Sequence, residues 1–142
     1  MNRFHMPADM GGTPLLINLH TAAQRNTFFR NTLWTGEGLQ LTVMSIPQGG
    51  EIGVEMHRTL DQMLRVEEGV ALVQIGKSED RLHDERRVGE GCAILVPRGT
   101  YHNVRNLGRT PLKLSSVYGP PAHAKGTVHR TAEDAAREHE SH

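Results

Sequence analysis

Two short stretches of this 142-residue chain carry side chains that bind divalent metal ions. Glu55 and His57 are separated by one residue, Gln62 follows five positions after His57, and His102 lies in the second stretch. If residues 55–57 are extended, Glu55 and His57 project from one face of a strand, because side chains alternate with a period of two. Neutral imidazole and carboxylate are common ligands of divalent ions. The two stretches therefore predict a metal site.

Glycines and a proline frame these residues at regular intervals. Gly49 lies six positions before Glu55, and Gly69 lies seven after Gln62. The second stretch contains Gly91, Pro97, Gly99, His102 and Asn106. These patterns resemble the two motifs of the cupin superfamily, which place His-x-His, Glu and a later His between glycines at the same intervals. The resemblance covers residues 39–118. It implies an all-β fold, the cupin barrel (a double-stranded β-helix or jelly roll) of the small, RmlC-like type-2 kind.

Two ligand positions depart from the family pattern. Glu55 stands where the family usually has its first His, and Gln62 stands where it has Glu. The resemblance implies one divalent metal ion held by Glu55, His57, Gln62 and His102. This set keeps the single negative charge of the usual three His and one Glu. An oxygen in place of an imidazole shifts the preference toward Mn or Fe, with Ni and Zn as further candidates. The resemblance also places the site at the mouth of the barrel, which implies that some coordination positions of the ion remain open.

Gln62 has a second interpretation. Leu64 and Val66 alternate with polar residues after it, which places Gln62 on an inward, apolar face. A buried amide needs a partner, and a metal, a water or a bound substrate would each serve. If the amide binds a metal-bound water instead of the ion, the ligands that remain are Glu55, His57 and His102. That set is the facial triad of non-haem iron oxygenases.

Short runs bounded by Gly and Pro predict the strands that position these residues. They span residues 15–19, 28–35, 39–46, 62–67, 70–75, 93–96, 102–106 and 112–118, together with a charged edge strand over residues 81–87. Many short strands with such turns indicate a barrel or jelly roll. Both faces of residues 39–46 are apolar, which predicts cover on the outside by a second sheet or a partner subunit. Thr131 caps a short helix over residues 132–139 that must dock or fray.

The predicted organisation is one domain with two extensions. Residues 1–14 form a flexible arm, residues 15–121 the cupin barrel, and residues 122–142 a C-terminal extension with the short helix. The 16 basic residues equal the 16 acidic ones, so no nucleic-acid footprint is expected, and the natural partner is a small molecule or another subunit. No run approaches the ~18 apolar residues of a membrane span, and no leader is evident. The resemblance also implies a homodimer.

The other candidate residues have structural alternatives. Cys92 is expected to be a buried spacer in a cytoplasmic protein, with a reactive thiol as the alternative. Tyr101 and Trp34 are candidate substrate contacts, with packing as the alternative. The remaining histidines are expected on the surface: His5, His20, His83, His123, His129, His139 and His142.

Three function hypotheses follow. The first is an enzyme of isomerase or tautomerase type, whose metal acts as a Lewis acid on a small sugar-derived or keto or hydroxy acid substrate. Small cupins similar to this chain include sugar isomerases and a uronate-opening enzyme whose shell also contains Gln. The second is an O₂-dependent Fe(II) dioxygenase. The third is a non-catalytic sensor or ligand-binding module. The residues do not indicate a general base.

Overall fold

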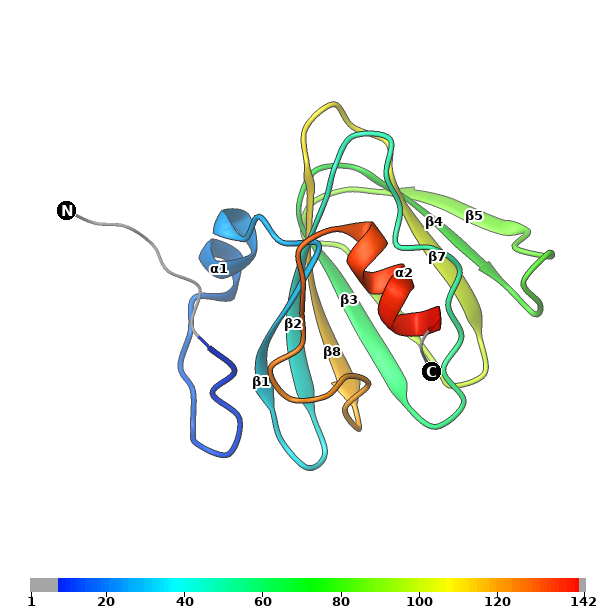
Figure 1. Ribbon diagram of the computed structural model, residues 1–142. Helices are drawn as coiled ribbons and strands as arrows, with labels where there is room; N and C mark the ends of the chain where they lie inside the picture. The colour runs from blue at the N-terminus through cyan, green and yellow to red at the C-terminus, as the bar shows by residue number, and fades with distance from the viewer. Residues whose placement is uncertain (1–7, 141–142) are drawn as a thin grey trace.

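Two β-sheets face each other in the computed structural model, which describes residues 8–140 (Figure 1). The larger sheet has six strands in the order β6-β3-β8-β2-β1-β9. The smaller has three, in the order β5-β4-β7. The strands are β1 (Arg30–Thr35), β2 (Gln40–Ile46), β3 (Asp61–Glu68), β4 (Ala71–Gly76), β5 (Asp84–Val88), β6 (Ala93–Val96), β7 (Tyr101–Asn106), β8 (Leu112–Gly119) and β9 (Val128–His129). The paired strands are antiparallel, so the predicted all-β barrel is confirmed.

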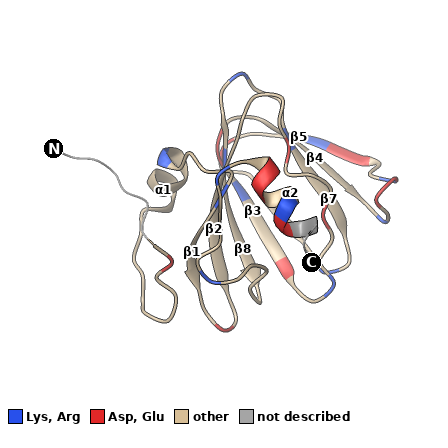
Figure 2. Cartoon of the chain, viewed as in Figure 1, with Lys and Arg blue, Asp and Glu red and all other residues tan. Residues whose placement is uncertain are grey.

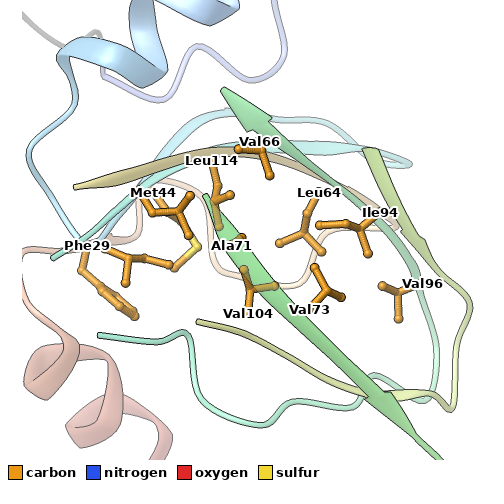
Figure 3. Close-up of a cluster of buried hydrophobic side chains, with 12 residues drawn as sticks. Phe29, Met44, Leu64, Val66, Ala71, Val73, Ile94, Val96, Val104 and Leu114 are labelled. Atoms are coloured by element: carbon orange, nitrogen blue, oxygen red, sulfur yellow. The ribbon is translucent and has the colours of Figure 1, made fainter. Parts of the chain in front are cut away.

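The apolar core lies between the two sheets (Figure 3). Alternate residues of each strand face inward, as Leu64 and Val66 of β3 and Leu114 of β8 show, and all three are fully buried. Val73 and Val104 close the core from the smaller sheet. Burying such side chains stabilises the fold by roughly 1.5–3 kcal/mol each. The core occupies one part of the interior, and buried polar side chains, among them Gln62 and His102, lie in another part.

A helix covers the outer face of the larger sheet. α1 (Leu19–Arg25) follows Asn18, whose side chain accepts a hydrogen bond from the Thr21 amide. Ala22 and Ala23 pack on Leu33 and Val43 of the sheet. The strand predicted over residues 15–19 is therefore wrong, because the Asn18 cap starts a helix where the apolar residues suggested a pleat. The expected cover on this face comes from the chain itself, at least over the part that α1 reaches (Figure 1).

The C-terminal extension folds back onto the barrel. β9 pairs with β1, so that His129 lies opposite Arg30. The helix α2 (Ala132–Glu140) begins after Thr131, whose hydroxyl accepts from the Asp134 amide. Ala135 of α2 packs against the core, so this helix docks, as its short length required. In Figure 1 α2 lies across the open side of the barrel between β3 and β7.

Several surface predictions are also resolved. Charged residues gather on β5, at the edge of the smaller sheet, and on α2 (Figure 2). His83 precedes β5 and is exposed, as predicted. Cys92 is partly exposed, not buried, because it lies in the turn before β6. His20 is half-exposed but is held by Glu67. The predictions for His5, His142 and the side chain of His139 fall outside the described residues.

No helix in the described part of the chain combines the length and the apolar character that a membrane crossing needs.

Candidate metal centre

Glu55, His57 and His102 come together at the polar end of the barrel interior. One ligand atom from each of the three lies within 4.8 Å of the other two. The backbone amides and carbonyls of Glu55 and His102 exchange two hydrogen bonds of 2.9 Å, so the two residues are direct cross-strand neighbours. Side chains of such a pair share one face of the sheet. His57 lies two residues further along, and its ring centroid is 5.8 Å from that of His102.

A glycine turn fixes the position of His57 relative to β7. The Gly99 amide donates to the His57 carbonyl at 2.7 Å, and Gly99 has a φ of 80°. Only glycine adopts that conformation readily, which explains its place in the second motif. Asn106, the last residue of that motif, donates from its amide to the carbonyls of Ile46 and Thr110. Asn106 therefore holds the turn that follows β7 and is not a ligand.

The hydrogen bonding of His102 leaves one ring nitrogen available for a metal. Nδ1 lies 3.1 Å from the Thr100 carbonyl, which can only accept, so Nδ1 carries the proton. Nε2 is then unprotonated, and its lone pair can bind a metal ion. It is buried and has no hydrogen-bond partner among the described residues. A metal-binding His is usually oriented in this way, because its other ring nitrogen donates a hydrogen bond to a carbonyl or carboxylate.

Burial lowers the pKa of His57. The carboxylate of Glu55 opposes this effect, whereas His102 and Arg30 add to it. The ring therefore favours its neutral, metal-binding form at neutral pH. His57 Nε2 is also buried without a hydrogen-bond partner in the described structure.

Gln62 presents its amide oxygen from the opposite sheet. Its side chain is buried on β3, as the alternation predicted. The Nε2 atom donates to the Ser116 hydroxyl at 2.9 Å, which fixes the orientation of the amide. The Oε1 atom is buried and unpartnered within the described residues. The Gln62 side chain also raises the pKa of His57 through hydrogen bonding, against the effect of burial, which places the amide beside that ring.

The residues present therefore fit a divalent ion. Two imidazole nitrogens and one amide oxygen are buried without partners next to the Glu55 carboxylate. Buried polar atoms almost always have a hydrogen-bond partner or bind a metal. Several buried atoms without partners in one place therefore indicate a bound group that contacts them. Imidazole, carboxylate and amide oxygen are all suitable ligands for such an ion.

Trp34 and Tyr101 do not join this site. Trp34 lies on the outer face of β1, where it borders a hollow with Leu15, Ile17 and Leu41. Its indole N–H donates to the Thr13 carbonyl at 2.7 Å, so it holds the N-terminal segment against the sheet. Tyr101 precedes His102 on β7 and therefore projects from the opposite face. Both positions support the packing alternative.

Sequence reasoning missed four polar residues in the same interior. Tyr118 is fully buried, with its ring centroid 5.9 Å from that of His57, and His123 follows at 5.4 Å from Tyr118. Arg30 and His129 lie beyond, joined by a 3.0 Å hydrogen bond. The predicted surface role of His123 and His129 is wrong, because the extension turns both rings toward the barrel. The one signal in the sequence for this polar interior was Tyr118, an aromatic residue at the end of the last predicted strand.

Comparison with known proteins places the chain in a family. The model of the cupin domain matches residues 42–118, and the chain belongs to this family. YrkC, an uncharacterised protein of Bacillus subtilis (strain 168), is 50% identical over 127 residues, which cover 89% of this chain and 68% of YrkC. The crystal structure of BH2720 from Bacillus halodurans matches with a TM-score of 0.91 and 51% identity, over 92% of this chain and 99% of that one. KdgF from Halomonas sp. matches with a TM-score of 0.58 at 19% identity, over 66% of this chain and 80% of that one, which shows a shared fold only.

Proposed function

We propose that the chain is a metal-dependent enzyme of isomerase or tautomerase type that acts on a small sugar-derived, keto or hydroxy acid substrate. One observation carries this proposal. The Nε2 atoms of His57 and His102 and the Oε1 atom of Gln62 are buried and unpartnered beside Glu55, among the described residues. A divalent ion bound there would supply a Lewis acid that polarises a carbonyl or hydroxyl oxygen of the substrate.

The chain's own residues would position the substrate and move its protons. Burial raises the pKa of Tyr118, so its hydroxyl stays protonated and can donate a hydrogen bond to a substrate oxygen. The hydroxyls of Ser116 and Thr42 act against this rise, so they lie beside the buried Tyr118 hydroxyl. Glu55 and His57 remain partly accessible, while His102 is buried, so a substrate would approach from the Glu55 side. Glu55 is the one carboxylate of the three clustered residues, and an oxygen of Glu55 that the ion leaves free could accept a substrate proton.

The alternative is an O₂-dependent Fe(II) dioxygenase. The observation that favours it is the compact group of Glu55, His57 and His102, which is a two-His, one-carboxylate set without Gln62. The hydrogen bond that Gln62 donates to Ser116 is compatible with Gln62 inside or outside the ligand set. A protein that binds the metal and small acids without turnover would be a sensor instead.

Metal content tests the site directly. Wild type, His57→Ala and His102→Ala are purified without chelator, and bound Mn, Fe, Co, Ni and Zn are counted per chain. We expect about one ion per chain in the wild type and loss of the ion in both variants. His83→Ala is the matched control, because His83 is exposed and far from the site in sequence. Full occupancy in His102→Ala, with circular dichroism unchanged, would contradict the ligand assignment.

Substrate chemistry separates the two enzyme classes. The metal-loaded protein is incubated in D₂O with small hydroxy and keto acids and sugar acids, and NMR follows deuterium entering the carbon beside the carbonyl. Metal-dependent exchange without O₂ uptake supports the isomerase class. O₂ consumption that requires iron supports the dioxygenase, and binding without either reaction leaves the sensor.

A further inference from the structure

A buried arginine lies in the barrel interior without a carboxylate partner. Arg30 is 4% exposed, and no described carboxylate forms an ion pair with its guanidinium. Its one hydrogen bond in the described structure comes from Nη1 to Nδ1 of His129, and its Nε atom is buried and unpartnered. Buried charges are normally paired, because an isolated one loses its hydration without compensation. Arg30 therefore lacks an anion.

The surroundings of Arg30 compensate its charge only in part. His129 makes a second hydrogen bond to Glu138 of α2, and the Glu138 side chain is 41% exposed. The guanidinium carbon also lies 5.5 Å from the centroid of the Phe29 ring, a weak cation–π contact. Neither contact gives the buried Nε atom of Arg30 a hydrogen-bond partner.

Buried polar atoms continue from Arg30 toward the metal ligands. The Nε2 atom of His123 is buried without a hydrogen-bond partner among the described residues. The buried hydroxyls of Tyr118 and Thr42 lie close enough to act on each other. Ring contacts lead from His129 through His123 and Tyr118 to His57, with centroid separations of 6.1, 5.4 and 5.9 Å.

We propose that Arg30, with Tyr118 and His123, binds the carboxylate of a small hydroxy or keto acid whose other oxygen faces the metal ligands. The guanidinium supplies a planar pair of donors that matches a carboxylate. A monoanion fits best, because Arg30 is a single cation and Glu55 adds a negative charge near the same interior. This proposal rests on the proposed function and narrows its substrate to acids. It also gives the C-terminal extension a role, since His123 and His129 both come from it.

Metal-free protein tests the carboxylate site without the metal. Chelator-treated wild type is melted in acetate, in acetamide and in chloride at equal ionic strength. We expect acetate to raise the melting temperature, while acetamide, which has the same shape without the charge, does not. Equal effects of acetate and acetamide on the wild type would overturn the proposal, and this comparison needs no variant to fold.

Metal-loaded protein tests the substrate geometry. Calorimetry measures glycolate binding to wild type, Arg30→Gln and Arg30→Lys, with metal content and circular dichroism checked in each. We expect glycolate affinity to fall at least tenfold in Arg30→Gln and less in Arg30→Lys, which keeps the charge but loses the fork. His123→Gln should weaken glycolate binding about threefold. This variant tests the site in place of the Arg30 variants if neither of them folds. Arg86→Gln is the control, since the Arg86 side chain is 77% exposed on β5.

The outcomes separate the two proposals. Unchanged glycolate affinity in Arg30→Gln with the ion still bound means that glycolate only chelates the metal, and the carboxylate site is overturned while the metal site stands. If the wild type takes up no metal, the proposed function fails. An acetate effect that depends on Arg30 in the same metal-free protein would still support the anion site.

Discussion

Gln62 differs from the other three candidate ligands because it is neutral and reaches the site from the opposite sheet. Its Nε2 atom is held by Ser116, and its Oε1 atom remains without a partner in the described structure. Ser116 can donate as readily as accept, because a hydroxyl rotates. A carboxylate at position 62 would therefore find the same hydrogen bond and add one negative charge to the ligand set.

Gln62→Glu should tighten divalent metal binding about tenfold, because the ion gains a charged oxygen ligand. Competition with a chromophoric chelator measures the change. Gln48→Glu adds the same charge in an exposed turn before the site and controls for a general electrostatic effect. Unchanged or weaker metal affinity in Gln62→Glu would place residue 62 outside the ligand set.

His123 predicts how stability depends on pH. Burial, then Arg30, His129 and His57, lower its pKa from 6.5 to about 3. The unfolded chain therefore binds this proton between pH 6.5 and 3 while the folded chain does not. The free energy of unfolding falls as pH falls through that window, with a slope of up to about 1.4 kcal/mol per pH unit from this group. The lowered pKa of His57 acts in the same direction.

His123→Gln should flatten that slope in metal-free protein, as measured by urea unfolding at a series of pH values from 7 to 4. His83→Gln should leave the slope unchanged, because His83 is exposed. Parallel curves for wild type and His123→Gln would mean that the ring is hydrated in solution.

At the scale of elements, α1 is attached to the sheet through a buried carboxylate. Glu67 of β3 is 1% exposed and accepts hydrogen bonds from Ser115 and Arg65, with His20 of α1 on the same oxygen as Arg65. Burial raises the pKa of Glu67, but these three partners outweigh it and hold the pKa below its usual value. The charged form of Glu67 therefore contributes to the docking of α1.

Glu67→Gln should lower the free energy of unfolding by about 2 kcal/mol, since charge-assisted hydrogen bonds to a buried group are lost. Chemical denaturation at neutral pH measures the effect. Glu37→Gln is the control, because Glu37 is exposed between β1 and β2 and its replacement should change stability by less than about 0.5 kcal/mol. Equal losses in the two variants would argue against a special role for Glu67.

The elements also show where prediction from sequence succeeded. Alternation along β3 placed Gln62 inward, and the intervals of the two motifs placed Glu55, His57 and His102 together, because both patterns depend on local strand geometry. The strand predicted over residues 15–19 is absent and α1 after it was not predicted, since the short apolar run has no clear period, although Asn18 offered a cap. His123 and His129 could not be placed, because their burial depends on a long-range return of the C-terminal extension onto β1.

At the scale of the whole molecule, part of the larger sheet's outer face is not covered by α1. Leu95 of β6 is 72% exposed and Leu39 is 47% exposed, on either side of a hollow of about 480 Å³ that Met63 and Val117 also line. The one carboxylate in the lining is Asp61, and its oxygen lies 4.0 Å from the Arg98 side chain. A two-fold contact places a surface against itself, which requires that the patch carry little uncompensated charge.

We therefore expect a homodimer formed through this face, with a second copy of the chain covering Leu95. Sedimentation velocity of the wild type should give about twice the 15.8 kDa chain mass. Leu95→Lys should shift the equilibrium toward monomer, because a self-facing patch would bring two ammonium groups together. Leu16→Lys is the matched control, since Leu16 is 93% exposed on the N-terminal segment beside α1. A wild-type monomer would contradict the dimer. A dimer that both variants leave intact would move the interface to another face.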